Sequence, residues 1–279
     1  MKRIVSIQDI SCFGKCSLTV ALPIISAMGV EAAIIPTAVL STHTGGFTGF
    51  TFRDLTSDIN DIAAHWKSYN ISFDGIYTGY LGSKEQIDIV SNFFDNFKTP
   101  ETKIIVDPVL GDNGNFYTGF DKNFAAEMKK LCSKADIIVP NMTETSFLLD
   151  IPYVEQPDEK TVKELLVKLT ELGCSTAVIT GVRFDEQHHG AAAYDSKTGK
   201  FYTSFSKHID KSVHGTGDIF SSVLSGSCML TGDFQKALDT AVNFTCECIE
   251  ATLPIFEQHK YGAAFELCMG NLSKYAENL

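Results

Sequence analysis

The chain has 279 residues, of which 44% are hydrophobic and 20% charged, a composition typical of a soluble globular protein. Its 34 acidic residues outnumber 23 lysines and arginines, which gives a formal net charge of −11. No lysine and arginine cluster interrupts this balance, which argues against nucleic acid and anionic membranes as partners. No run reaches the roughly 18 apolar residues of a membrane span, and no signal-peptide pattern follows Met1.

The strand-like runs alternate with helical patterns along most of the chain, as in successive βαβ units. We predict parallel strands at Ile4–Gln8, Ala33–Val39, Gly75–Tyr80, Lys103–Val106, Ile137–Val139 and Ala177–Thr180. Two later strands, Gly190–Tyr194 and Lys200–Phe205, are joined by a turn-rich segment and predict an antiparallel hairpin at the sheet edge. The sequence therefore predicts one doubly wound α/β domain over residues 1–279.

The predicted helices carry recognisable start and stop signals. Ser17 is expected to cap Leu18–Met28, Ser83 and Gln86 to form a capping box for the helix to Phe97, and Gly173 to close Val162–Leu172. The C-terminal part predicts three more helices, Ile219–Leu230, Phe234–Glu250 and Ala263–Tyr275.

The eight cysteines are scattered without paired metal-ligand spacing, which predicts reduced thiols in a cytoplasmic protein. Cys12 and Cys16 are the only pair near a suspected site. Their Cys-x-x-x-Cys spacing differs from that of thiol oxidoreductases, so we expect no redox role.

The segment Gly215-Thr216-Gly217-Asp218 lies where a loop is predicted to enter an apolar helix. Free backbone N–H groups and the positive end of the helix dipole meet at such a junction, which favours a bound anion. A carboxylate in that position suits a base that activates an alcohol for phosphoryl transfer. An ordinary glycine-rich turn with Asp218 as a helix cap would give the same pattern.

Polar residues also follow nearly every predicted strand, at the sheet edge where open α/β proteins bind ligands. They occur at Gln8-Asp9, Ser41–Gly46, Gly79–Gly82, Asp107–Asp112, Pro140–Glu144 and Thr180-Gly181. Several of these residues could instead have a purely structural role. Asn141 and Glu144 could simply cap a helix that begins near Thr143, and His43 and Tyr80 could be structural.

These motifs in this order resemble the pyridoxal kinase branch of the ribokinase-like superfamily over essentially the whole length. The resemblance implies a three-layer α/β/α fold with a central, mainly parallel sheet and an antiparallel edge hairpin. It implies ATP-dependent phosphorylation of the 5′-hydroxymethyl group of pyridoxal, pyridoxamine or pyridoxine. It further implies Mg²⁺, leaves open a monovalent cation such as K⁺, and favours a homodimer.

The resemblance also assigns roles residue by residue. Asp218 matches the general base, and Gly215, Thr216 and Gly217 match the anion hole. The ATP-binding positions are Asp107, Asp112, Asn141, Glu144, Thr180 and Thr216, of which Asp107, Asp112 and Glu144 are near the metal. The substrate-binding positions are Asp9, His43, Thr44 and Tyr80.

Two positions depart from better-known members of that branch, which have serine at position 9 and often threonine at position 139. Here they are Asp9 and Val139. A carboxylate at position 9 favours a cationic substrate group, and we hypothesise a preference for pyridoxamine.

Two alternatives remain open at the level of function. A hydroxymethylpyrimidine kinase of thiamin synthesis shares the fold and the glycine-rich segment Gly215–Gly217, here called the cradle, although the start Ser6-Ile7-Gln8-Asp9 does not match that branch. A non-catalytic sensor of B6 vitamers or nucleotides would keep the pocket without turnover. The polar segments Gln187–His189 and Lys207–Val213 are candidate lids, and His188 and His189 are expected to face water without a ligand role.

Overall fold

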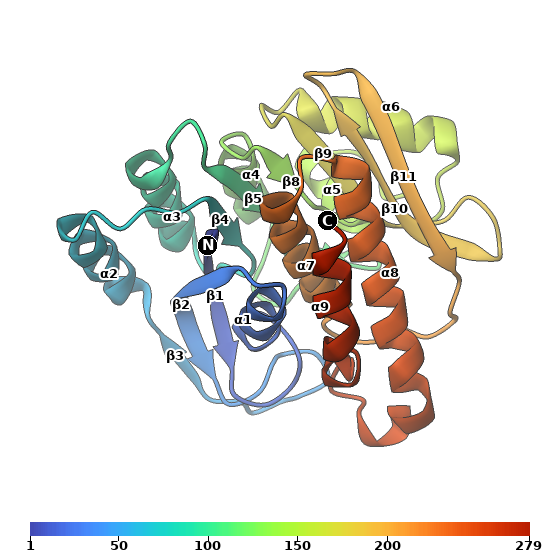
Figure 1. Ribbon diagram of the computed structural model, residues 1–279, viewed down its shortest axis with the longest axis horizontal. Coiled ribbons are helices and arrows are strands. Elements are labelled where there is room, and N and C mark those ends of the chain that lie inside the picture. The colour runs from blue at the N-terminus through green and yellow to red at the C-terminus, as the bar shows by residue number, and fades with distance from the viewer. The chain divides into compact units, whose positions relative to one another are not determined.

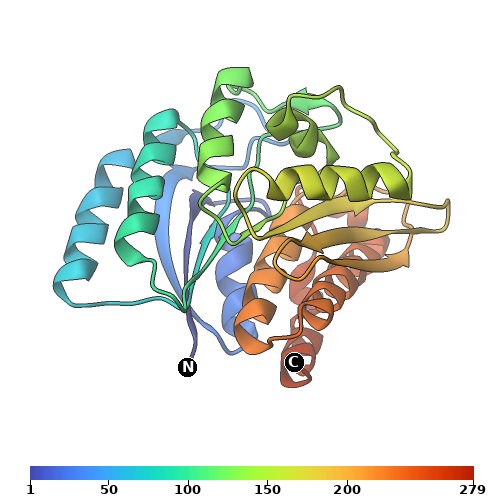
Figure 2. The same cartoon turned by 90° about the horizontal axis from the view of Figure 1, so that it is seen from above.

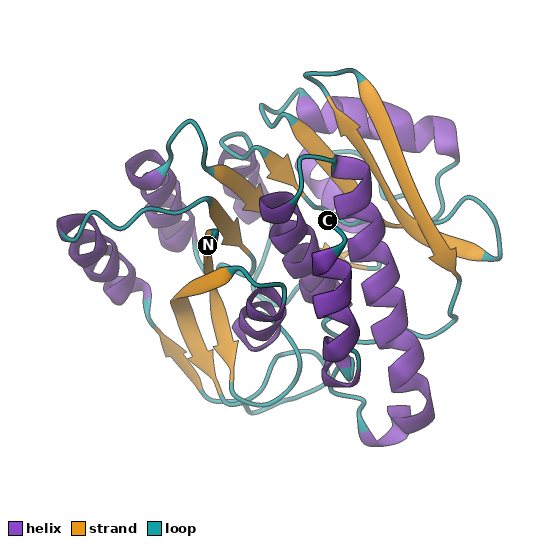
Figure 3. Ribbon diagram, viewed as in Figure 1, coloured by secondary structure: helices purple, strands orange, loops and turns teal.

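The computed structural model describes all residues from Met1 to Leu279 and divides into two compact units. Unit 1 combines residues 1–82 with residues 209–279, and unit 2 is the continuous segment Ser83–His208. Figures 1 and 2 show the chain from two directions, and Figure 3 marks its helices and strands. Unit 1 is therefore discontinuous in sequence, with unit 2 inserted into it.

The strands of unit 1 have the order β4–β1–β2–β3, with bounds Gly75–Thr78, Arg3–Ser11, Glu31–Leu40 and Phe52–Asp54. β1 is parallel to both neighbours and pairs Ile4 with Ala32 and with Gly75, whereas β3 is antiparallel to β2. All four residues of β4 are buried, as are most residues of β1. Such burial is typical of parallel strands covered on both faces and explains their continuous apolar runs.

The helical elements of unit 1 are α1 (Leu18–Ala27), α2 (Thr56–Ser68), α7 (Thr216–Leu230), α8 (Phe234–Thr252), η1 (Leu253–Gln258), η2 (Phe265–Leu267) and α9 (Met269–Glu277). Helix α7 packs against α1 and α8, and it is buried from Ile219 to Met229. Small residues permit this close packing. A Cβ atom on Gly226 would lie only 2.5 Å from the Met28 sulfur.

The strands of unit 2 have the order β11–β10–β9–β8–β5, with bounds Lys200–Lys207, His188–Asp195, Thr176–Val182, Ile137–Ile138 and Lys103–Val106. β5, β8 and β9 are parallel, and β10 is antiparallel to both β9 and β11. The predicted hairpin is confirmed, and β11 forms the edge of this sheet (Figure 1).

The other elements of unit 2 are α3 (Lys84–Phe97), β6 (Gly111–Asp112), β7 (Asn115–Phe116), α4 (Lys122–Cys132), α5 (Met142–Leu149) and α6 (Glu159–Thr170). Each helix begins after a residue whose side chain accepts a backbone N–H bond, namely Ser83, Asp121, Asn141 and Asp158. The predicted cap at Ser83 is confirmed, since its hydroxyl accepts the Gln86 N–H at 3.2 Å.

Two local predictions are wrong. The helix expected over Ala263–Tyr275 is instead a 3₁₀ turn followed by α9, because the N–H groups of Ala263 and Ala264 bond to His214 O and Thr252 Oγ1. Ser17 precedes α1 but its hydroxyl does not cap the helix. The backbone there is left-handed, with φ at +53°, and the hydroxyl bonds to Asp9 instead.

Candidate active site

Asp9 is a buried carboxylate near the carboxyl end of β1, with 4% of its surface exposed. The pairing of β1 with β2 changes register between Gln8 and Ile10. The Ser11 hydroxyl donates to Asp9 at 3.1 Å, and the Ser17 hydroxyl also bonds to it. Burial nevertheless raises the pKa of Asp9, because these bonds and the nearby His43 only partly offset the loss of hydration. A cationic ligand would favour its ionised form.

Asp218 occupies the first turn of α7, directly after the predicted cradle. The helix begins at Thr216, three residues before the predicted start, so Gly215 is the N-cap residue with a left-handed backbone at φ +81°. The Thr216 hydroxyl donates to Val213 O at 3.2 Å. The first backbone N–H groups of a helix have no partner within it, so this turn can bind an anion.

Cys16 lies close to both carboxylates and was given no role by the sequence analysis. Its thiol donates to Ser11 Oγ at 3.3 Å. Burial, together with the charges of Asp218 and Asp9, raises the pKa of the Cys16 thiol, so the sulfur remains protonated. The structure therefore places the predicted base and the substrate-side carboxylate around one neutral thiol.

His43 is buried in the loop after β2, and backbone groups occupy both of its ring nitrogens. The Gly45 N–H donates to Nδ1 at 3.1 Å, so Nε2 carries the proton and donates to Tyr261 O at 2.7 Å. The ring also contacts Phe47 and His214, with centroid distances of 5.0 and 5.4 Å. His43 therefore offers a ligand its ring surface rather than a free nitrogen.

The other two predicted substrate residues differ in placement. Tyr80 is half-buried after β4, and burial followed by the Asp9 charge raises the pKa of its hydroxyl. Thr44 is exposed. In unit 1 the structure thus brings Asp9, His43, Tyr80 and Asp218 into one cluster, with Thr44 at the surface.

The segment Tyr261–Glu266 joins this cluster, which sequence reasoning missed because the residues read as the start of a helix. Lys15 N donates to Tyr261 O at 3.3 Å, and its ammonium pairs with Glu266 and lies 5.0 Å over the Phe265 ring. The Ala263 N–H donates to His214 O at 3.1 Å. The segment therefore connects the loop after β1 to the residue preceding the cradle.

In unit 2, Asn141 and Glu144 form a reciprocal capping box at the start of α5. Asn141 Oδ1 accepts the Glu144 N–H, and Glu144 Oε2 accepts the Asn141 N–H, both at 2.9 Å. The other Glu144 oxygen accepts the Leu110 N–H at 2.9 Å, and Asn141 Nδ2 donates to Gly111 O at 2.9 Å. The local capping role is thus real, and it also ties α5 to the loop after β5.

The Glu144 carboxylate is 4% exposed and Asp107 is 7% exposed. Burial, and then the charge of Asp107, raises the pKa of Glu144 well above its usual range. Thr180 lies beside Asn141. The Thr180 N–H donates to Pro140 O at 3.0 Å, and Thr180 and Asn141 form an isolated parallel bridge. Asp112 is exposed and binds Asn113.

The donors of unit 2 suit a hard cation such as Mg²⁺, which prefers oxygen ligands and keeps several waters. A bound cation would reduce the repulsion between the buried carboxylates of Glu144 and Asp107. No group of three or more histidine, cysteine, aspartate or glutamate side chains is arranged to hold a metal by itself. A cation here would take its remaining ligands from phosphate and water.

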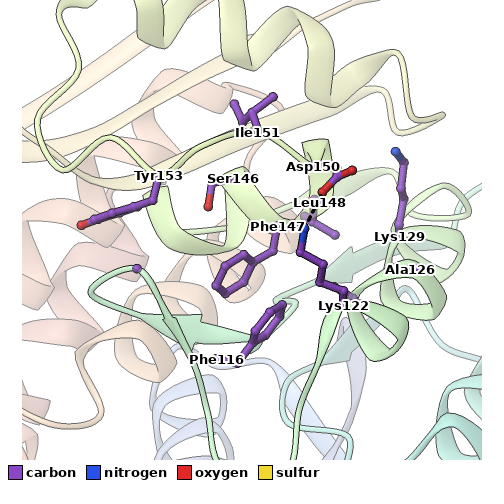
Figure 4. A pocket seen from close by; sticks show the side chains of 12 residues that line it. Phe116, Lys122, Ala126, Lys129, Ser146, Phe147, Leu148, Asp150, Ile151 and Tyr153 are labelled. Carbon is purple, nitrogen blue, oxygen red and sulfur yellow. Dashed lines mark hydrogen bonds and ion pairs between the residues drawn. The ribbon is translucent and has the colours of Figure 1, made fainter.

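A pocket of about 360 Å³ also lies in unit 2, beside α4 and α5 (Figure 4). Phe116 and Phe147 stack at 3.7 Å within it, and Lys122 pairs with Asp150 at 3.3 Å. It contains none of the predicted site residues. The candidate active site is therefore defined by the polar clusters at the strand ends, not by this pocket.

A carboxylate in the first turn of α7 after two glycines and an acidic capping box at the start of α5 suit an α/β phosphotransferase. The family model described as phosphomethylpyrimidine kinase matches residues 21–262, and the chain belongs to this family. None of the helices is long and apolar enough to cross a membrane.

Solved structures and a curated relative are similar along nearly the whole chain. A Bacteroides thetaiotaomicron protein, provisionally assigned as a phosphomethylpyrimidine kinase and crystallised with pyridoxal, is 41% identical over 97% of this chain and 95% of its own, with a TM-score of 0.92. Pyridoxal kinase from Lactobacillus plantarum is 29% identical over 100% of this chain and 99% of its own, with a TM-score of 0.91. Pyridoxal kinase from Dictyostelium discoideum is 24% identical, covering 99% and 96%. These similarities confirm the predicted resemblance and the ribokinase-like α/β fold.

Proposed function

We propose that the protein transfers the γ-phosphoryl group of ATP to the 5′-hydroxymethyl group of a vitamin B6 vitamer, in salvage of pyridoxal 5′-phosphate. The main support is the cluster in unit 1, where Asp9 and Asp218 lie close enough to Cys16, beside the cradle, for both charges to add to the effect of burial in raising the pKa of its thiol. Similarity to a pyridoxal-bound structure over 97% of the chain agrees with this assignment. We further propose that residues 1–279 act as one kinase domain.

In this proposal Asp218 is the general base. It accepts the proton of the vitamer hydroxyl as that oxygen bonds to the γ-phosphorus, and the bond to the β,γ-bridging oxygen breaks to release ADP. The N–H groups of Gly215, Thr216 and Gly217 donate to the phosphoryl oxygens as charge develops, each worth roughly 3 kcal/mol by analogy with other anion holes. Positioning and electrostatics supply most catalysis in such transfers.

Unit 2 would bind the nucleotide. Asn141 and Glu144, fixed by their reciprocal bonds, would orient waters around Mg²⁺, while Asp107 and Asp112 would face the cation. Thr180 would donate its hydroxyl group to the nucleotide, and Thr216 of unit 1 is the further nucleotide position that the resemblance assigns. Mg²⁺ would neutralise phosphate charge when bound, and a monovalent cation such as K⁺ would serve the same end.

Unit 1 would bind the vitamer, with the pyridine ring against His43 and Tyr80, and Thr44 at the entrance. Asp9 would pair with a cationic group, either the protonated ring nitrogen or the amine of pyridoxamine. The pyridoxamine preference is testable with Asp9→Ser. Unchanged relative efficiency toward pyridoxal and pyridoxamine in that variant would rule it out.

Phosphorylation of hydroxymethylpyrimidine is the second candidate, because the family description and the Bacteroides relative both refer to phosphomethylpyrimidine. The deciding experiment is steady-state turnover with ATP and Mg²⁺ on pyridoxal, pyridoxamine, pyridoxine and hydroxymethylpyrimidine. We expect B6 vitamers to be phosphorylated with the higher kcat/KM. A higher kcat/KM on hydroxymethylpyrimidine would instead assign the protein to thiamin synthesis, and binding of the vitamers without turnover would indicate a sensor.

We also propose a cytoplasmic homodimer. All eight cysteines are free thiols, as expected in a reducing compartment. Light scattering coupled to size-exclusion chromatography tests the dimer, and a mass of one chain, 30.6 kDa, would contradict it.

A further inference from the structure

A cluster of one arginine and two histidines lies at the carboxyl end of β9 and β11 and the start of β10, within unit 2. Arg183 Nη1 lies 3.1 Å from His208 Nε2, and the rings of His208 and His189 meet edge to face at 5.5 Å. All three side chains are half-buried. Phe184 packs against Phe205 at 5.1 Å and fixes this segment to the hairpin.

The positive charge of Arg183 is not neutralised by any carboxylate. Several other cations of unit 2 are paired with carboxylates, as in Lys134 with Asp95 at 2.7 Å. The acidic neighbour Asp185 bonds instead to the ring and backbone N–H of His188 and to the Gln187 N–H. Arg183 therefore keeps a full charge in a protein whose net charge is −11.

His208 holds the guanidinium without neutralising it. An arginine can only donate, so His208 Nε2 is the acceptor and the imidazole is neutral, with its proton on Nδ1. That Nδ1 is buried and without a partner, as is Nδ1 of His189. Burial, and beyond it the charge of Arg183, lowers the pKa of His189, so its ring also stays neutral. The expectation that His189 simply faces water is therefore wrong, whereas His188 is exposed and pairs with Asp185.

The same edge of unit 2 holds the nucleotide residues of the proposed function. Arg183 is three residues after Thr180, which is bridged to Asn141. The other ionisable groups assigned there, Asp107, Asp112 and Glu144, are all acidic and would repel a polyphosphate in the absence of a cation. We propose that Arg183, held by neutral His208, forms an anion subsite that binds the phosphate groups of the nucleoside triphosphate.

This inference rests on nucleotide binding by unit 2, and Arg183→Gln tests it. The matched control, Lys197→Gln, removes one positive charge from the exposed turn at the opposite end of the same hairpin. ATP, ADP and adenosine are titrated into each variant by calorimetry. We expect the Kd for ATP and ADP to rise at least about tenfold in Arg183→Gln, the loss of one charge-assisted bond, with adenosine unchanged. Lys197→Gln should bind all three like wild type.

Substitutions at His208 separate charge from position. His208→Asn keeps a neutral acceptor and should bind ATP within about threefold of wild type, whereas His208→Asp pairs the guanidinium with a carboxylate and should lose affinity like Arg183→Gln. Equal ATP affinity in these two variants would overturn the proposal. So would a uniform loss of ATP and adenosine binding in Arg183→Gln, which would indicate a structural role, with thermal unfolding as the check.

The failure of the proposed function gives a different result. A wild-type protein that binds ATP but phosphorylates no vitamer would refute the kinase assignment, and the calorimetric comparison would still decide the role of Arg183. Unchanged ATP affinity in an Arg183→Gln variant that phosphorylates pyridoxal would overturn the subsite alone.

Discussion

The backbone carbonyl of Lys15 occupies the space that a side chain on Gly215 would need, because a Cβ atom there would lie 1.9 Å from Lys15 O. Gly215 also has a left-handed backbone at φ +81°, which favours glycine. Gly217 differs on both counts, since a Cβ atom there would meet nothing within 4 Å. Glycine is therefore required at position 215 by backbone conformation and lack of space, whereas neither reason applies at position 217.

Gly215→Ala and Gly217→Ala should therefore behave differently. We expect Gly215→Ala to lower both the melting temperature and kcat, because the loop after β1 must move. Gly217→Ala should leave the melting temperature unchanged or raise it, since alanine favours a helix by up to about 1 kcal/mol, while its methyl group obstructs phosphate and lowers kcat. Thermal unfolding and kinetics on the same samples check this. Equal destabilisation by both substitutions would contradict the steric argument.

Asp218→Asn should abolish most turnover with little effect on binding. Loss of a general base typically costs about 10²- to 10⁴-fold, and we expect kcat to fall by that amount while KM for ATP changes less than about threefold. Asp61→Asn, on the exposed part of α2, is the control. If Asp218→Asn kept a tenth of wild-type kcat, Asp218 would not be the general base.

Asp9 makes a prediction about the pH dependence of stability. Its pKa is raised in the folded protein by burial, so its neutral form favours folding at acidic pH and that contribution is lost as pH rises through the folded pKa. Asp9→Asn cannot ionise. Without ligand, we expect it to melt higher than wild type at pH 8 and the difference to shrink toward pH 4.

Asp121 provides a control of opposite sign for that experiment. It caps α4, and the Phe124 N–H lowers the pKa of its carboxyl. The advantage of wild type over Asp121→Asn should therefore be present at neutral pH and vanish as pH falls. If the difference in melting temperature from wild type changed with pH in the same direction for both variants, it would not arise from ionisation of the substituted carboxylates.

The acidic pair of unit 2 links stability to metal binding. Burial, and then the charge of Asp107, raises the pKa of Glu144, so Asp107→Asn should relieve repulsion and raise the melting temperature at pH 8 in EDTA by about 2–4 °C, or about 1 kcal/mol. The same variant should lose most turnover and most of the stabilisation that ADP with Mg²⁺ gives wild type. Full stabilisation by ADP with Mg²⁺ in the variant would place the cation elsewhere.

The sequence predicts most strands because buried parallel strands read as apolar runs, as at Ile4–Gln8. It does not indicate α2, which buries only Thr56 and Ile59 and so lacks an apolar stripe. The start of α7 is predicted late because Gly215 and Gly217 look like loop residues, although one is the N-cap and the other lies in the first turn.

Side-chain partners depend on tertiary structure that no local pattern contains. The role of Ser17 changed from helix cap to Asp9 donor because β1 and α1 bring the two together. Tyr261 contacts His43 across 218 positions of sequence, and no periodicity indicates such a bond. Cys16 lies near the suspected site in the sequence, but its two carboxylate neighbours are evident only in the structure.

The discontinuity of unit 1 has a consequence for synthesis of the protein. Unit 2 is continuous and is complete once residue 208 has left the ribosome, whereas the proposed vitamer site in unit 1 still lacks the cradle and Tyr261–Glu266. The nascent chain therefore gains the proposed nucleotide residues of unit 2 first and the proposed vitamer site of unit 1 last. Until the final seventy or so residues emerge, α1 and β4 lack helix α7, which later packs against both, and this is the interval in which a chaperone would act.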